Sequence, residues 1–232
     1  MAKHNYFVAG TDTDAGKTLV TTGILEAANR LGLKTIGLKP VAAGCEATAD
    51  GLRNDDALKL QQAASVKLGY DSVNPVALAA PVAPHIAATQ AGRTLSADRI
   101  AALCRGSMMH SADLLLIEGA GGWRVPLNGR EMLSRVPQLL ETPVILVIGM
   151  KLGCINHALL SAEAIVRDGL RIAGWVANRV DPGMACYDEN LATLKGLFPV
   201  PLLGEVPHLA KPSAAAVADC LDVSSLLAAG PA

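Results

Sequence analysis

The sequence predicts an α/β fold in which one parallel sheet carries helices on both faces. Short apolar segments alternate with longer helical patterns along most of the 232 residues. Most of the apolar segments lack alternation of polar and apolar residues, which is typical of strands that are covered on both faces. Aromatic residues make up only 3% of a chain that is 51% hydrophobic, so the core must consist largely of Ala, Val, Leu and Ile.

Six strands and six helices account for this alternation. Strands are predicted at residues 6–9, 35–38, 114–117, 144–148, 172–176 and 201–206. Helices are predicted at residues 18–31, 56–65, 96–109, 133–140, 156–168 and 187–197, and Gly32 and Gly169 are expected to cap two of them. Repeated strand–helix–strand units require right-handed crossovers, and ligands then bind at the carboxyl ends of the strands. We expect a single domain over residues 1–232, with the Ala-rich tail from Ala214 unassigned.

Composition and charge exclude several classes of protein. The net charge is −1 and no basic stripe is visible, which argues against nucleic acid or a membrane surface as the main partner. The five cysteines are scattered and lack zinc-site spacing, so free thiols in a reducing compartment are expected. The first residues run directly into a strand, without a signal peptide. The longest apolar run, Val144–Ile148, is too short to span a bilayer. A cytoplasmic protein is predicted.

A phosphate-binding loop follows the first strand. The segment Gly10–Thr18 ends in Gly-Lys-Thr and leads directly into a helix. Small residues let backbone N–H groups point at an anion, while the lysine reaches the outer phosphates and the hydroxyl ligates Mg²⁺. Five residues, instead of the usual four, separate Gly10 from Gly16. The strand–loop–helix setting nevertheless predicts a P-loop NTPase-like fold.

Carboxylates follow at places where a magnesium–nucleotide site needs them. Glu118 ends an apolar strand and opens a glycine-rich segment that reaches Gly122. Asp55 and Asp56 precede a predicted helix, and a hard cation prefers such oxygen ligands. Spacing alone does not decide which of the two aspartates faces the site, because Asp and Asn also cap helices.

Several segments together resemble the dethiobiotin synthetase family. The most specific are the Lys39-Pro-Val-Ala segment and the Lys151-Leu-Gly-Cys-Ile-Asn-His157 segment. The full set, in chain order, comprises residues 10–18, 39–44, 51–57, 84–87, 118–123, 151–157, 174–178 and 204–207. These segments cover nearly the whole chain, from residue 5 to about residue 210.

The resemblance implies roles for particular residues. Thr18, Asp56 and Glu118 match the family's Mg²⁺ ligands, which favours Asp56 over Asp55. Lys39 and Lys17 match its catalytic lysines. Asn178 matches the residue at the adenine edge, and the loop at Pro207 lines the other side of the base. The nucleotide-binding set implied by the resemblance is Asp14, Ala15, Gly16, Lys17, Thr18, Leu19, Asp56, Glu118, Gly119, Ala120, Gly121, Asn178, Arg179, Pro207, His208 and Leu209.

The resemblance also implies a reaction. In this family the diamine of 7,8-diaminononanoate takes up CO2 as a carbamate, which attacks the γ-phosphate of the co-substrate ATP. The second amine then closes the ureido ring of dethiobiotin, a step of biotin biosynthesis, and ADP and phosphate are released. Every step builds negative charge on carbamate or phosphoryl oxygens, so fixed cations and Mg²⁺ serve this chemistry.

A second subunit is implied by the segment that begins near Gly153. The first N–H groups of a helix are free donors at a positive dipole end, which suits a carboxylate. In the family this helix start belongs to the neighbouring subunit and holds the substrate's distal carboxylate, so a homodimer with shared sites is expected. The implied substrate contacts are Lys39, Gly153, Cys154, Ile155 and Asn156. One departure is Ala43, where family members often carry a hydroxyl that contacts the substrate.

Two other functions are weighed against this one. Regulatory ATPases of the chromosome-partitioning or septum-placement type share the fold and the deviant phosphate loop. They usually carry a second lysine early in the loop, where this chain has Asp12, and they need a basic surface, whereas nothing after Lys211 is basic. A related amide-forming ligase that acts on a larger carboxylate is the other alternative. ADP formation that depends on both diamine and bicarbonate would distinguish the three.

Overall fold

A six-stranded parallel sheet forms the centre of the computed structural model, which describes residues 4–228. The strand order is β10-β9-β8-β1-β7-β2, and every adjacent pair is parallel. The strands are β1 His4–Gly10, β2 Thr35–Leu38, β7 Leu114–Glu118, β8 Val144–Gly149, β9 Ile172–Asn178 and β10 Leu202–Val206. The predicted parallel sheet is therefore confirmed, and each predicted strand end lies within two residues of the observed one.

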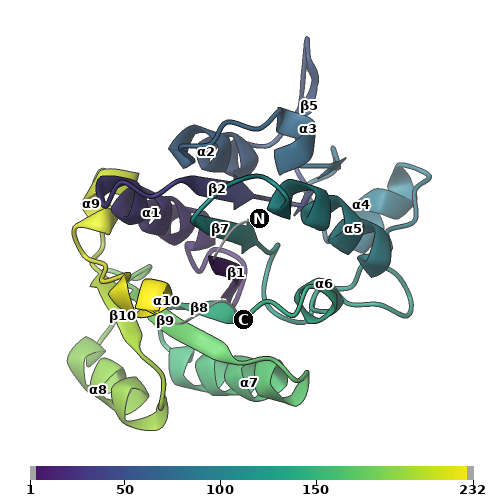
Figure 1. Cartoon of the computed structure of the whole chain (residues 1–232). Helices are drawn as coiled ribbons and strands as arrows, with labels where there is room; N and C mark the ends of the chain where they lie inside the picture. Colours follow the sequence, from purple (N-terminus) through teal and green to yellow (C-terminus); the bar gives the residue numbers. More distant parts are fainter. Residues whose placement is uncertain (1–3, 229–232) are drawn as a thin grey trace.

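Helices cover both faces of this sheet, as Figure 1 shows. One face carries α1 Lys17–Arg30, α9 Ala214–Ala218 and α10 Ser224–Ala228. The other carries α5 Ala97–Met108, α6 Arg135–Leu139, α7 Cys154–Arg167 and α8 Tyr187–Leu197. Two further helices, α2 Asp55–Ala63 and α3 Tyr70–Val73, lie beyond the edge strand β2. The unassigned tail thus contributes two short helices that pack beside α1.

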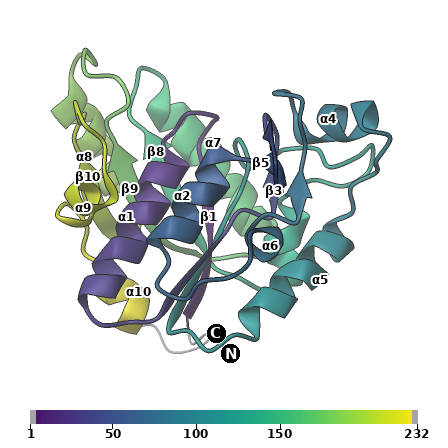
Figure 2. The same ribbon diagram turned by 90° about the horizontal axis from the view of Figure 1, so that it is seen from above.

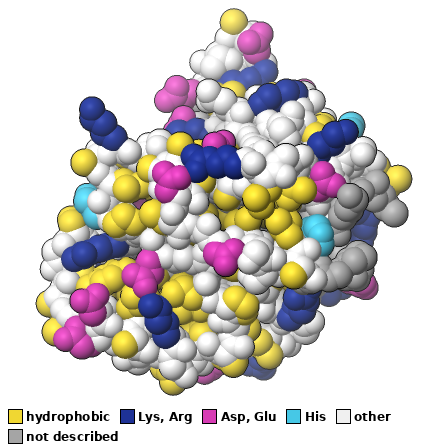
Figure 3. Space-filling view, turned by 60° about the vertical axis from the view of Figure 1, so that its left-hand side comes forward, with side chains coloured by type: hydrophobic (Ala, Val, Ile, Leu, Met, Phe, Trp, Pro, Cys, Tyr) yellow, Lys and Arg dark blue, Asp and Glu magenta, His cyan; other side chains and the backbone are white. Residues whose placement is uncertain are grey.

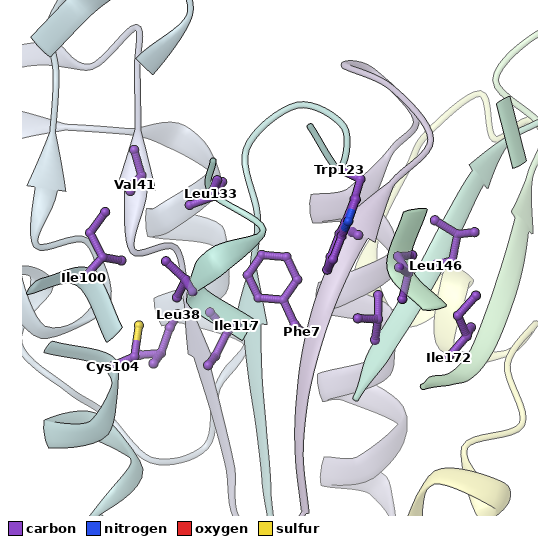
Figure 4. Packing of buried hydrophobic residues seen from close by; sticks show 14 of the residues in the cluster. Phe7, Leu38, Val41, Ile100, Cys104, Ile117, Trp123, Leu133, Leu146 and Ile172 are labelled. Atoms are coloured by element: carbon purple, nitrogen blue, oxygen red, sulfur yellow. The ribbon is translucent and has the colours of Figure 1, made fainter. Parts of the chain in front are cut away.

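The core divides into two layers because successive side chains of a strand point to opposite faces. Phe7 belongs to the layer under α5 and α7, whereas Tyr6 and Val8 belong to the layer under α1. Figure 4 shows Phe7 beside Trp123, with Leu146 farther along the same layer. The two rings meet edge to face, with centroids 6.1 Å apart and planes at 84°. Trp123 comes from the loop after β7, so this contact anchors that loop to β1.

Short elements that the periodicity did not predict lie between β2 and α5. Two-residue strands β3 Val41–Ala42 and β6 Val76–Ala77 pair in parallel, and β4 Glu46–Thr48 and β5 Gly51–Arg53 form an antiparallel hairpin. Helix α4 spans Pro84–Gln90. Elements of two to seven residues are too short to show a reliable period. In Figure 2, β3, β5 and α4 gather on one side of the molecule, away from α8 and β10.

Both predicted glycine caps are confirmed. Gly32 follows α1 with φ +77°, and Gly169 follows α7 with φ +82°. In each case the next residue donates its N–H back to the last turn, from Leu33 to the Ala28 carbonyl and from Leu170 to the Ile165 carbonyl, both at 3.2 Å. Left-handed backbone favours glycine because it has no Cβ.

The topology places β1 at the point where the strand order changes direction. After β1 the chain crosses to β2 on one side, and β8, β9 and β10 follow on the other. Ligands of open α/β sheets bind in the crevice at such a point, outside the carboxyl ends of the strands. Within residues 4–228, no helix is long and apolar enough to cross a membrane. On the face shown in Figure 3, lysine and arginine side chains are interspersed with acidic ones.

Candidate functional site

A cleft of about 770 Å³ opens at the carboxyl ends of β1, β2 and β7. Its walls combine the phosphate loop, the segments after β2 and β7, the start of α2 and the turn before α4. The lining residues are Thr13, Asp14, Gly16, Lys17, Thr18, Leu19, Lys39, Ala42, Ala43, Asn54, Asp56, Lys59, Pro81, Val82, Ala83, Pro84, Ala120, Gly121, Gly122 and Val125.

The phosphate loop directs the positive end of α1 into this cleft. Helix α1 begins at Lys17, directly after Gly16, whose φ is +86°. A Cβ at Gly16 would lie 2.0 Å from Nδ2 of Asn178, so only glycine fits there. Lys17 is nearly buried, and its Nζ donates to the Asp12 carbonyl at 3.3 Å. A helix N-terminus preceded by such a loop is suited to bind phosphate.

Lys39 is the central cation of the cleft. It follows β2 and is only 5% exposed. Its Nζ donates to Glu118 Oε1 at 2.6 Å, to Asp56 Oδ2 at 3.0 Å and to the Gly119 carbonyl at 3.3 Å. A buried ammonium needs such acceptors because burial without partners is costly. The structure therefore brings together three residues that are far apart in the sequence.

Three oxygen-bearing side chains converge beside Lys39. The Thr18 hydroxyl donates to Glu118 Oε1 at 2.7 Å, and both Glu118 and Asp56 accept from Lys39. Glu118 is completely buried, and its Oε2 has no hydrogen-bond partner among residues 4–228. A buried carboxylate oxygen without a protein partner is suited to a water molecule or a cation. The hydroxyl and the two carboxylates form an all-oxygen donor set, which fits Mg²⁺.

The two neighbouring aspartates face different surroundings. The Asp55 side chain is 79% exposed and pairs with Lys59 one helical turn away, at 2.5 Å. The Asp56 side chain is 40% exposed and lines the cleft. Asn54 caps α2 by accepting the N–H of Ala57 at 3.2 Å, which fixes the first turn and with it the direction of Asp56. Sequence spacing did not decide which of the two aspartates faces the site. In the structure Asp56 lines the cleft and Asp55 lies outside it.

The charges in the cleft shift one another's protonation equilibria. Burial opposes ionisation of Asp56, but the Lys39 ammonium outweighs it, and the pKa of Asp56 is lowered. Burial likewise disfavours charge on Lys39, but Glu118 and Asp56 outweigh it and the pKa of Lys39 is raised. For Lys17, burial and then the nearby Lys39 charge lower the pKa. Asp56 thus stays ionised and Lys39 protonated at neutral pH.

The predicted adenine contacts lie outside the lining of the cleft. Asn178 ends β9 and is buried, and its Nδ2 donates to the Ala15 carbonyl at 2.9 Å. One of its two amide N–H groups therefore holds the phosphate loop, and its side-chain oxygen is able to accept a hydrogen bond. The Arg179 guanidinium lies 4.6 Å from the Tyr187 ring and donates to the Pro182 carbonyl. Residues 207–209 follow β10, on the same side of the sheet as β9.

The predicted carboxylate anchor also lies outside the cleft. Gly153 has φ +93° and precedes α7. The expectation of free N–H donors throughout this segment is wrong at Cys154, whose N–H donates to the Lys151 carbonyl at 2.9 Å. The tight turn that Gly153 makes brings that carbonyl within reach. The N–H groups of Ile155 and Asn156 have no acceptor within residues 4–228. Leu152, directly before this turn, is 90% exposed.

Sequence reasoning missed part of the cleft wall. The turn Pro81–Pro84, the residue Val125 and the cap Asn54 all line it. The sequence did carry a signal here, because Pro81 and Pro84 flank a short apolar turn and proline is common at the first position of a helix, as at the start of α4. Ala43 also lines the cleft, and its methyl group offers no hydrogen bond there.

The fold and the site define a P-loop nucleotide-binding α/β protein. A family model described as "AAA domain" matches residues 4–216. Two solved structures share the fold. The septum site-determining protein MinD of Pyrococcus horikoshii is 17% identical with TM-score 0.54, covering 95% of this chain and 88% of that one. The MinC:MinD complex of Aquifex aeolicus is 15% identical with TM-score 0.56, covering 98% and 86%.

Curated relatives define the family more narrowly. The ATP-dependent dethiobiotin synthetase BioD of Cellvibrio japonicus is 58% identical over 98% of this chain and 99% of its own length. The enzyme of the same name from Pseudomonas aeruginosa is 57% identical over 95% and 97%, and that from Aeromonas hydrophila is 48% identical over 96% and 99%. The chain belongs to the dethiobiotin synthetase family, which confirms the resemblance found in its motifs.

Proposed function

We propose that this protein is an ATP-dependent dethiobiotin synthetase. It forms the ureido ring of dethiobiotin from 7,8-diaminononanoate and CO2 and converts ATP to ADP and phosphate, a carbon–nitrogen ligase step of biotin biosynthesis. The single observation that carries the proposal is the position of Lys39. A buried lysine lies 2.6 and 3.0 Å from two carboxylates at the mouth of a phosphate loop, in a chain 58% identical to a protein of this name.

The chemistry needs cations at fixed positions. One amine of the substrate adds to CO2 and gives a carbamate, whose oxygen attacks the γ-phosphorus while ADP leaves. The second amine then attacks the carbamate carbon, closes the ring and expels phosphate. Lys39 and Lys17 are both buried, and their ammonium groups would oppose the negative charge on the carbamate and phosphoryl oxygens. In a water-poor site such preorganised charges are worth several kcal/mol of barrier, roughly 3–4 kcal/mol each.

Thr18, Asp56 and Glu118 would hold Mg²⁺. The unpartnered Glu118 Oε2 supports this role, and so does the exposed edge of the Asp56 carboxylate that lines the cleft. When bound, the ion supplies positive charge at the phosphate oxygens and orients them. The segment from Asp14 to Leu19 would bind the phosphates through backbone N–H groups. Gly119, Ala120 and Gly121 would complete the phosphate site, and Ala120 and Gly121 line the cleft.

The adenine would lie against Asn178. One N–H of the Asn178 amide bonds the Ala15 carbonyl, which fixes the side chain, and its oxygen would accept the exocyclic amino group of adenine. The backbone of Arg179 and the Pro207–Leu209 segment would complete the base site; the Arg179 side chain is engaged with Tyr187.

The protein would act as a cytoplasmic homodimer with shared sites. The Gly153–Asn156 turn does not line the cleft of its own chain, yet Ile155 and Asn156 keep free donors. Leu152, directly before that turn, and Leu160 of α7 are exposed apolar side chains. A second chain that packs against this part of α7 would bring the donors to the carboxylate end of a substrate in the partner's cleft.

Asp12 distinguishes this proposal from the septum-placement ATPases. The position where those proteins carry a second lysine here holds a carboxylate, which pairs with Lys151 at 3.2 Å. The proposal is tested by ADP formation. We expect ADP release that requires 7,8-diaminononanoate and bicarbonate together, with dethiobiotin formed in equal amount. ADP release at the full rate with neither compound present would contradict the proposal and favour a regulatory ATPase.

The metal assignment makes a separate prediction. Asp56→Asn should raise the Mg²⁺ concentration needed for half-maximal activity by about tenfold or more, because one of two carboxylate ligands is lost. Asp55→Asn is the matched control, since its carboxylate faces solvent and should leave the Mg²⁺ requirement nearly unchanged. Magnesium titrations of both variants decide the point, and the reverse order of effects would assign the ligand to Asp55.

A further inference from the structure

The backbone of Lys39 is held by residues that belong to no wall of the cleft. Strand β2 is the edge of the sheet, so its outer side and the residue that follows it lack a neighbouring strand. Residues 73–74 supply the hydrogen bonds that a neighbouring strand would otherwise make with Lys39. The Lys39 N–H donates to the Val73 carbonyl at 2.9 Å, and Asn74 Nδ2 donates to the Lys39 carbonyl at 2.6 Å. Both hydrogen-bonding groups of the Lys39 backbone are therefore paired with the end of α3.

The side chain of Asn74 is also connected to the start of α2, through the hydroxyl of Tyr70. Tyr70 donates its hydroxyl to Asn74 Oδ1 at 3.0 Å and accepts the backbone N–H of Asn54 at 2.7 Å. Asn54 is the cap of α2, and Asp56 is the second residue of that helix. A continuous chain of hydrogen bonds thus joins the Lys39 carbonyl, Asn74, Tyr70 and Asn54, and it links the two segments that carry Lys39 and Asp56.

The buried surroundings allow only one direction for each of these hydrogen bonds. Asn74 is 2% exposed and Tyr70 is 9% exposed. The Asn74 amide must place its nitrogen toward the Lys39 and Val76 carbonyls, so its oxygen is left for the phenol. Burial raises the pKa of Tyr70, which keeps the phenol protonated and able to donate. On the outer side, the Arg53 guanidinium lies over the Tyr70 ring, 4.2 Å from its centre.

We propose that Tyr70 and Asn74 are positioning residues that set the distance between Lys39 and Asp56. This inference rests on the proposed function, in which these two groups act on the phosphoryl group and on Mg²⁺. Neither Tyr70 nor Asn74 lines the cleft, so they act only through the backbones that they hold. The hydrogen bond between Lys39 Nζ and Asp56 Oδ2, at 3.0 Å, connects the end of an edge strand to a separate helix. The chain of hydrogen bonds through Asn74 and Tyr70 connects the backbones of the same two elements. Misplacing a catalytic group by about 1 Å can cost roughly 10²-fold in rate.

The test is Tyr70→Phe, which removes one hydroxyl and keeps the ring under Arg53. We expect kcat to fall about tenfold and the Mg²⁺ requirement to rise at least about threefold. The KM for ATP should change less than about twofold, because the phosphate loop and the Asn178 region are untouched. The matched control is Tyr6→Phe. Tyr6 is a buried phenol that donates to the Leu226 carbonyl on the opposite face of the sheet, so its loss should lower thermal stability and leave kcat and the Mg²⁺ requirement unchanged.

A double variant tests whether the loss of kcat in Tyr70→Phe results only from lower stability. Tyr70→Phe combined with Asn74→Leu removes both partners of the inner hydrogen bond, and it also leaves the Lys39 carbonyl and the Asn54 N–H without their partners, so its thermal unfolding is measured before its activity. Double-variant protein that is folded at the assay temperature should show a loss of kcat at least as large as that of Tyr70→Phe. Wild-type kcat and Mg²⁺ requirement in a folded variant would overturn the positioning role, provided that Lys39→Ala and Asp56→Asn are impaired. If those two are themselves silent, the proposed function of the site has failed, and the positioning role fails with it.

Discussion

Replacing Lys39 by alanine is expected to lower turnover by about 10²- to 10³-fold, which corresponds to roughly 3–4 kcal/mol of transition-state stabilisation. Lys39 is buried, and its ammonium contacts both carboxylates and the loop after β7. Lys17, the other buried lysine of the cleft, is directed at the phosphate loop, with its Nζ on the Asp12 carbonyl. Single-turnover measurements with saturating ATP and Mg²⁺ would report this loss in the chemical step.

The control for this experiment must separate catalysis from stability. Removing Lys39 leaves the fully buried Glu118 without its nearest cation, and an unpaired buried charge destabilises a fold. Thermal unfolding should therefore be measured with Mg²⁺ and nucleotide present. Lys195→Ala, which breaks an exposed pair with Glu205, should leave both turnover and stability nearly unchanged. A loss below fivefold for Lys39→Ala would rule out its catalytic role.

The second large effect is expected from mixed dimers. Lys39→Ala removes the cation at the reacting end of the substrate, and Asn156→Pro removes a free N–H at the proposed carboxylate anchor. Neither homodimer should be active. If each site combines the cleft of one subunit with the anchor of the other, a mixed dimer has one site with both defects and one site with neither. Its activity should then return to about half that of the wild-type dimer.

Geometry favours this experiment because Asn156 lies in the first turn of α7. Its N–H makes no helical hydrogen bond, so proline there leaves the rest of the ladder intact. Size-exclusion chromatography of differently tagged chains establishes that the two variants fold and pair. Inactive mixed dimers under those conditions would show that each site lies within one chain.

The sequence predicted the regular part of this molecule well. The strands of the central sheet were recognised as continuous apolar runs, and helices longer than eight residues carry enough turns for their period to be read. The glycine and lysine pattern before α1 located the phosphate loop, because anion binding demands those residue types at that place. Glu118 was predicted in the same way, since an apolar strand that ends in an acid brings it to the edge of the sheet.

Other parts of the site depend on contacts between segments that are distant in the sequence. Asp55 and Asp56 are equivalent in composition, and only the helix direction set by the Asn54 cap separates them. Tyr70 and Asn74 resemble ordinary residues of a polar turn, yet tertiary contacts bury them under Lys39. The amide of Cys154 was expected to be free, but a local turn satisfies it. Such pairings depend on three-dimensional neighbours and carry no periodic signal.

The central position of β1 also governs when this site can form during synthesis. The first strand to emerge pairs with β7 on one side and β8 on the other. Both partners lie more than a hundred residues later in the chain. Until about residue 149 has left the ribosome, the strand that carries the phosphate loop cannot be flanked on both sides. Non-local pairings of this kind slow folding and prolong the exposure of apolar strands, so an apolar and nearly charge-free β1 is the segment most in need of protection in the nascent chain.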